Sequence, residues 1–170
     1  IKLKPTNYMT NQKHLWATLK FDYLKNKKQD SQKIFSDFIN ENNDKENLIL
    51  HRANHCYVIM NYYPYNNGHL MVIPNKEVDK FEDIDDKVLS EIMSVSKKVM
   101  KILRSSFNCD GFNFGANVGQ GSGASIPSHL HFHIVPRWKN DTTFMPVIGN
   151  TKVMAQTLHD TYEPVSYTHL

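Results

Sequence analysis

Three histidines alternate with apolar residues in the stretch SHLHFHIVPRW, which covers residues 128–138. His129, His131 and His133 stand at every second position. A repeat of two is the side-chain repeat of a β-strand, so the pattern predicts a strand with three imidazole rings on one face and apolar side chains on the other. The fold must therefore contain a half-buried strand whose polar face carries three titratable rings.

Three short runs rich in apolar and β-branched residues precede this stretch, over residues 47–50, 55–61 and 69–74. The sequences RAN and YYPYNNG separate them, and the second is rich in turn-forming residues. Strand-like runs split by turn signals are typical of neighbouring antiparallel strands. This part of the chain is predicted to form a β-meander.

Residues 83–106 change to a helical repeat, in which apolar residues recur at spacings of three and four. Aspartates stand at the start of the segment and basic residues toward its end, which complements a helix dipole. Residues 111–118 then alternate strictly, with Asn113, Gly115 and Asn117 on one side. A glycine-rich loop, residues 119–128, joins this predicted strand to the histidine strand, so the two polar faces are expected to line one cleft.

The composition limits the class of protein that can carry this site. The chain has 170 residues, enough for one domain with a sizeable core, and its apolar runs are too short to span a membrane. No segment near the first residue resembles a signal peptide, so a cytoplasmic protein without membrane or nucleic-acid partners is expected. Cys56 and Cys109 are too few for a disulfide framework and are predicted to be reduced core residues. The net charge of +3 suits an anionic ligand.

The histidines allow three interpretations: surface residues without a role, metal ligands, or a nucleophile with supporting groups. His-x-His on a strand can supply metal ligands, but residues i and i+4 lie roughly 13 Å apart on a straight strand, too far for one ion. A neutral imidazole is a good nucleophile toward phosphorus near pH 7 and a good leaving group afterwards. The loop GQGSGAS adds backbone N–H groups and the hydroxyls of Ser122 and Ser125, which suit a phosphate.

The order His-apolar-His-apolar-His-apolar-apolar over residues 129–135 resembles the signature of the histidine triad (HIT) family. The stretch NYYPYNNGHLMVIP over residues 61–74 is similar to the family's first active-site segment, so the resemblance covers about residues 47–148. The segments NVGQGSGAS, PRW and DTTFMPVIG resemble those of bacterial diadenosine tetraphosphate phosphorylases. The resemblance therefore implies transfer or hydrolysis of a nucleotidyl group from a dinucleoside polyphosphate through a nucleotidyl-histidine intermediate.

The resemblance also implies roles for individual residues. His131 would attack the α-phosphorus, and His129 and His133 would orient and help to neutralise the phosphate. The expected substrate-binding residues are Asn61 at a ribose, His69 in the Gly-His turn, Asn117, Gly123 and Ser125 at the phosphate, and Trp138. Core packing is an equally good use for Trp138, and Asn113 is a candidate from alternation alone.

The fold implied is α+β, a five-stranded antiparallel sheet with a long helix packed on one face, paired into a homodimer. Residues 1–46 are expected to form a polar, partly helical extension, residues 47–148 the HIT domain, and residues 149–170 a C-terminal segment whose last residues look foreign to it. No metal or cofactor is expected, because the Cys-x-x-Cys pair of zinc-binding members is missing. Inorganic phosphate is the expected acceptor, with Mg²⁺ on the substrate's phosphates. Water as acceptor, phosphoramidase activity, or a nucleotide-binding module without catalysis are the alternatives.

Overall fold

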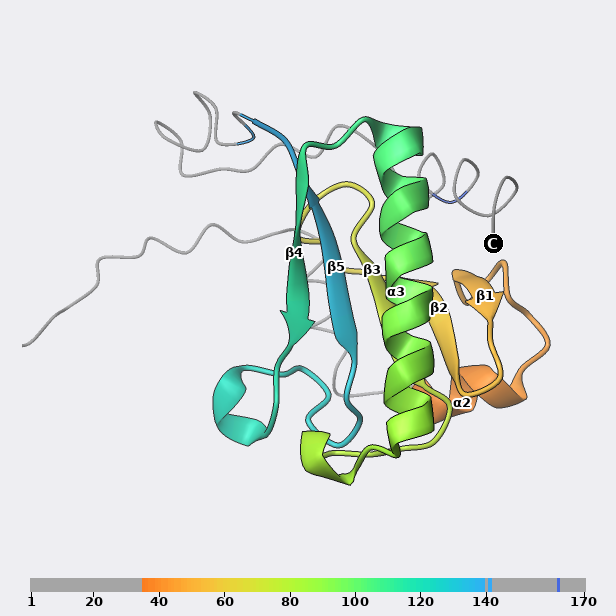
Figure 1. Cartoon of the computed structure of the whole chain (residues 1–170). Coiled ribbons are helices and arrows are strands. Elements are labelled where there is room, and N and C mark those ends of the chain that lie inside the picture. The colour runs from red at the N-terminus through yellow and green to blue at the C-terminus, as the bar shows by residue number, and fades with distance from the viewer. Residues whose placement is uncertain (1–34, 140, 142–161, 163–170) are drawn as a thin grey trace, which may run out of the picture.

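One antiparallel sheet of five strands forms the centre of the molecule (Figure 1). The computed structural model describes residues 35–139, together with Asp141 and Tyr162. The sheet order is β1-β2-β3-β5-β4, and all four neighbouring pairs are antiparallel. The strand bounds are β1 Ile49–Arg52, β2 Cys56–Met60, β3 Leu70–Pro74, β4 Gly111–Ala116 and β5 Phe132–Arg137. The predicted five-stranded α+β fold is confirmed.

The long helix α3, Asp86–Phe107, lies across one face of this sheet (Figure 1). The side chain of Asp85 accepts a hydrogen bond from the backbone N–H of Lys87, and Asn108 ends the helix in a left-handed conformation with φ of 47°. Both are favourable caps. The helix starts three residues after its predicted start, because residues 81–83 form a separate 3-10 turn, η1 Phe81–Asp83.

Alternate residues of the central strands supply two apolar layers. On the α3 side, Val58, Val72 and Ile134 are fully buried against helix residues such as Ile92 and Leu103. On the opposite side, a second cluster gathers around the short helix α2, Phe35–Asn40. The buried members of this second cluster are Phe35, Ile49, Tyr57, Ile59, Met71 and Ile73. Because both faces are covered, β2 and β3 contain five buried residues each rather than an alternation.

Two strands have other bounds in the structure than the sequence predicts. The first strand is Ile49–Arg52 rather than residues 47–50, because residues 44–48 are turn and Leu48 has a positive φ of 59°. The histidine strand was predicted from residue 128, whereas β5 begins at Phe132. Residues 125–129 form bends and turns, and the backbone N–H of Leu130 donates to the carbonyl of Val78 at 2.7 Å, outside the sheet.

The loop between β2 and β3 is tied firmly to β5. Gly68 has φ of +70°, and a Cβ at this position would lie 3.2 Å from Cγ of Pro136, so the turn requires glycine. The buried side chain of Asn66 donates to the carbonyl of Pro136 at 2.9 Å. These contacts hold the start of β3, and with it His69, next to the histidine strand.

Other predictions concern the remaining parts of the chain. Both cysteines are free and buried, as expected. Among the described helices, none is long and apolar enough to cross a membrane. The extension of residues 1–34 lies outside the described residues, as does the C-terminal segment except for Tyr162, whose hydroxyl donates to the carbonyl of Ile49 at 3.3 Å.

Candidate active site

Three histidine rings lie close together where the chain enters β5. The ring centroids of His131 and His133 are 4.8 Å apart, and those of His133 and His69 are 5.1 Å apart. His133 is paired across the sheet with Met71 on β3 and Gly115 on β4. Only His133 belongs to the strand, so the predicted strand face carries one of the three rings. His131 and His129 precede the strand and are buried, with 4% and 1% of their surfaces exposed.

The hydrogen bond of His131 assigns its neutral tautomer. Its Nδ1 lies 2.9 Å from the carbonyl oxygen of His129. A carbonyl only accepts, so Nδ1 carries the hydrogen and Nε2 keeps its lone pair. The ring of His131 therefore offers an unprotonated nitrogen, as a nucleophile requires.

His69 fixes the neutral tautomer of His133, which carries its hydrogen on Nε2, whereas His131 carries its hydrogen on Nδ1. Nδ1 of His69 receives the backbone N–H of Tyr65 at 3.0 Å, with Nδ2 of Asn61 at 3.3 Å, so it is an acceptor. Nε2 of His69 then carries hydrogen and donates to Nδ1 of His133 at 2.9 Å. The hydrogen of neutral His133 is thus placed on Nε2, a buried atom for which the described residues provide no partner. His133 thus offers a donor and His131 an acceptor nitrogen, on rings whose centroids are 4.8 Å apart.

His129 is held differently. Its Nε2 donates to the carbonyl of Pro74 at 2.9 Å, which leaves Nδ1 as a buried acceptor without a partner among the described residues. In its neutral form this ring has no further N–H for a phosphate oxygen. The contribution that the geometry supports is the carbonyl of His129, which orients His131.

A buried phenylalanine packs on the triad from helix α2. The Phe35 ring contacts His131 edge-on at 5.1 Å and His129 at 5.7 Å. The Tyr57 hydroxyl donates to the Phe35 carbonyl at 2.8 Å and so fixes the start of α2. The sequence predicts no chemistry in this region, and no local motif marks Phe35 as part of a site.

Burial keeps the histidines neutral. Desolvation lowers the pKa of His131 below its ordinary value, opposed by the hydrogen bond to the His129 carbonyl. Desolvation, together with the nearby His131, lowers the pKa of His133 to about 4. The pKa of His129 is also lowered, again mainly by burial. Neutral rings at pH 7 agree with the tautomers that the hydrogen bonds assign.

The lowered pKa of His131 predicts how the reaction rate falls at acidic pH. The neutral imidazole persists to lower pH than a free histidine, whose pKa is near 6.5. The single-turnover rate at His131 should therefore fall on the acid side with an apparent pKa below that of a free histidine. Rapid-quench rates between pH 5 and 8 measure this. An apparent pKa above 6.5 for this fall would contradict the assignment of a buried, neutral nucleophile.

The predicted phosphate-binding residues lie on β4 and the loop after it. Asn117 directly follows the last ladder pair, Ala116 with Phe132, so it stands next to the entry of the histidine segment. Gly123 has φ of +86° and ends the 3-10 turn η2, Gln120–Ser122, while Ser125 is exposed. The hydroxyl of Ser122 is used within the loop, where it donates to the carbonyl of Gly119 at 2.7 Å. Figure 1 shows this loop at the same end of the sheet as the start of α3.

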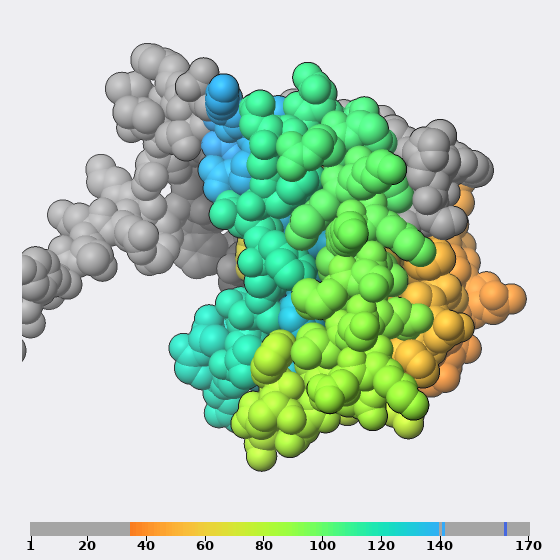
Figure 2. Space-filling model, in the orientation of Figure 1, coloured from red at the N-terminus to blue at the C-terminus, as the bar shows by residue number. Residues whose placement is uncertain are grey.

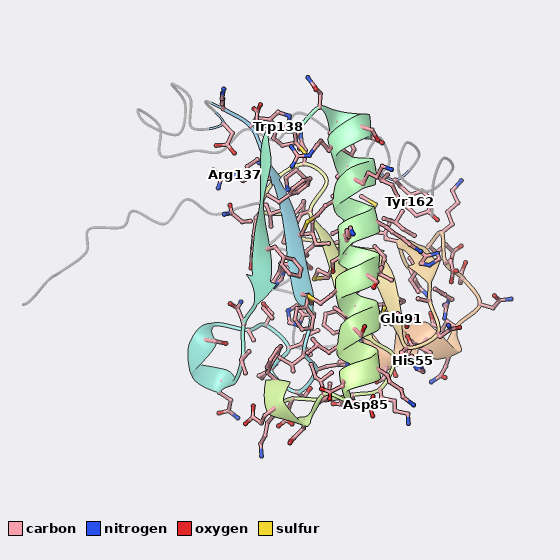
Figure 3. All side chains as sticks on the ribbon, in the orientation of Figure 1. His55, Asp85, Glu91, Arg137, Trp138 and Tyr162 are labelled. Carbon is pink, nitrogen blue, oxygen red and sulfur yellow. The ribbon has the colours of Figure 1, made fainter. Side chains whose placement is uncertain are left out.

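Three other candidates have contacts of their own. The indole Nε1 of Trp138 donates to the carbonyl of Phe107 at 3.1 Å, at the C-terminal end of α3, beyond the far end of β5 from the triad (Figure 3). Asn113 accepts a hydrogen bond from Arg137 at 2.7 Å near that same end. Asn61 is next to the site, because its side chain contacts His69 and accepts the backbone N–H of Tyr63 at 2.9 Å.

Within residues 35–139, and including Asp141 and Tyr162, no group of three or more histidine, cysteine or acidic side chains is placed to hold a metal ion. The hydrogen bonds and the lowered pKa values of the triad describe a set of neutral imidazoles near a glycine-rich loop. Such a set can provide a nucleophile, a neutral donor and backbone N–H groups to a phosphate.

Comparison with known proteins identifies the family. The model of the HIT domain matches residues 42–140. The chain belongs to the HIT domain family. A solved HIT structure, a hypothetical histidine triad nucleotide-binding protein from Sulfolobus tokodaii, superposes with a TM-score of 0.62 at 26% identity, covering 78% of this chain and 88% of that one. The fold predicted from the resemblance is thus shared with a solved member.

Two curated HIT relatives carry enzyme names. The AP-4-A phosphorylase of Mycobacterium tuberculosis is 42% identical over 118 residues, which are 69% of this chain and 60% of the relative. The asymmetrical bis(5′-nucleosyl)-tetraphosphatase of Schizosaccharomyces pombe is 29% identical over 93 residues, 55% of this chain and 50% of the relative. The chain thus matches 50 to 60% of the length of these two relatives.

Proposed function

We propose that this protein transfers a nucleotidyl group from a dinucleoside polyphosphate, such as diadenosine tetraphosphate, through His131 to inorganic phosphate. The observation that carries the proposal is the neutral His131, whose Nδ1 is bonded to the carbonyl of His129 and whose Nε2 keeps its lone pair. The names of the two curated relatives support the class of substrate.

In the first step, Nε2 of His131 attacks the α-phosphorus. The N–P bond forms as the P–O bond to the polyphosphate breaks, and the leaving group departs with the bonding electrons. His133, whose Nε2 carries hydrogen, donates to an oxygen of the phosphate chain as this negative charge develops. The carbonyl of His129 stabilises the Nδ1–H of His131 as the ring becomes cationic.

In the second step, an oxygen of inorganic phosphate attacks the same phosphorus and His131 leaves as a neutral imidazole. Diadenosine tetraphosphate would then give ATP in the first step and ADP in the second. Asn117, Gly123 and Ser125 are proposed to hold the phosphate oxygens. The 42% identity to a protein named as a phosphorylase favours phosphate over water as acceptor.

Product analysis with diadenosine tetraphosphate, with and without inorganic phosphate, tests the proposal. ADP and ATP should form only when phosphate is present. No protein-bound metal is proposed to take part, so EDTA should not abolish the activity by removing one. AMP and ATP at the same rate without phosphate would instead identify a hydrolase, which the name of the S. pombe relative favours. Binding without products would identify a nucleotide-binding module.

A homodimer is also proposed. Among the described strands β4 lies at the edge of the sheet, and beside it lies an apolar groove of about 410 Å³ lined by residues that include Phe81, Met93, Phe114 and Val118. Each of these four is more than one-third exposed. Figure 2 shows this face of the molecule, with part of β5 visible between β4 and α3. An exposed edge with apolar side chains suits a second copy. Light scattering of the protein in solution should give twice the chain mass.

A further inference from the structure

Tyr65 lies at the outer edge of the candidate active site. Its ring centroid is 4.7 Å from that of His69 and 5.7 Å from that of His133, with the ring planes tilted by 39° and 33°. At the same time 57% of the residue is exposed. The tyrosine therefore rests on two imidazole rings of the site and still presents most of its surface to solvent.

Four rings form a continuous row through the site. Neighbouring ring centroids in this row are 5.1 Å apart for Phe35 and His131, 4.8 Å for His131 and His133, and 5.7 Å for His133 and Tyr65. Phe35 is only 6% exposed, so the row is closed at the Phe35 end and reaches solvent at Tyr65. Tyr65 is thus two ring contacts away from His131, the residue at which the substrate is proposed to bond.

The position of Tyr65 is fixed by its backbone. Its N–H donates to Nδ1 of His69 at 3.0 Å, and the N–H of His69 donates to the carbonyl of Asn66 at 3.2 Å. Asn66 is in turn held by the carbonyl of Pro136 at 2.9 Å. A ring mounted on such a turn is in place before a ligand arrives, which lowers the entropic cost of stacking.

We propose that Tyr65 is the stacking platform for the second base of the dinucleotide, the base that departs with the polyphosphate. The inference rests on the proposed function, and it makes Tyr65 the residue that favours dinucleotides over mononucleotides. Every base has a π-face, so stacking discriminates weakly between bases. Tyr65 therefore selects for the presence of a second nucleoside more than for its identity.

Two substrates with the same number of phosphates test this role: diadenosine tetraphosphate, and adenosine 5′-tetraphosphate, which has no second nucleoside. Tyr65→Ala should lower kcat/KM for the dinucleotide by about ten-fold or more and change that for the mononucleotide less than about two-fold. Tyr65→Phe keeps the aromatic face and should keep the wild-type preference. Tyr62→Ala is the matched control, because Tyr62 is 55% exposed in the same loop but packs edge-to-face on Tyr63.

The two remaining outcomes would overturn the inference. An equal loss with both substrates would show that Tyr65 only supports His69 and His133, and no loss with either would show that no base stacks on it. Failure of the proposed function is a separate result, because the wild-type protein would then turn over neither substrate. An active wild-type enzyme whose substrate preference is unchanged in Tyr65→Ala would contradict the inference alone.

Discussion

His131→Asn is expected to lower kcat for diadenosine tetraphosphate by at least about 10⁴-fold, because the substitution removes the nucleophile and the intermediate with it. Asparagine retains an N–H that can donate to the carbonyl of His129, as Nδ1 of His131 does, so the buried acceptor stays satisfied. The measurement is steady-state turnover together with thermal unfolding of the variant.

The control is His55→Asn, an identical exchange at an exposed histidine in the turn between β1 and β2 (Figure 3). This variant should keep wild-type turnover, and both variants should unfold within a few degrees of the wild type. A folded His131→Asn protein with near wild-type turnover would exclude His131 as nucleophile.

His69→Ala is expected to lower kcat/KM on the order of 100-fold, although His69 itself is not proposed to bond with the reacting phosphorus. The substitution removes the donor that places the hydrogen of His133 on Nε2. Without it, His133 can adopt the other tautomer and present a lone pair where a donor is needed. The change should appear in kcat/KM measured with diadenosine tetraphosphate.

His69→Gln separates this positioning role from the loss of packing at a residue that is 1% exposed. The glutamine amide can both donate to His133 and accept a hydrogen bond, so this variant should recover a large part of the activity. Equal losses in His69→Ala and His69→Gln, with equal losses of thermal stability, would indicate a structural role only.

The sequence predicted the fold because its patterns are local. The repeat of α3 and the turn residues around Gly68 each specify one element, and the family signature supplied their arrangement.

The candidate site was predictable in its residues but not in its hydrogen bonds. The repeat of two suggested three equivalent rings, whereas Leu130 pairs with Val78 and the strand begins only at Phe132. The different tautomers of His131 and His133 depend on carbonyl and N–H groups from distant segments, which a sequence pattern does not encode. Phe35 reaches the site through tertiary packing from α2, so no spacing rule marks it. Tyr65 lies in the segment that resembles the family's first active-site segment, but its ring contacts with His69 and His133 come from the folded loop.

The stereochemical course at the α-phosphorus tests the central claim most directly. Diadenosine tetraphosphate carrying a chiral thiophosphate at that position can be converted with phosphate, and the configuration of the resulting thio-ADP determined. Each in-line displacement inverts the phosphorus centre, so transfer through His131 requires two inversions. The account predicts net retention of configuration. Net inversion would show that phosphate attacks the substrate directly, without a nucleotidyl-histidine.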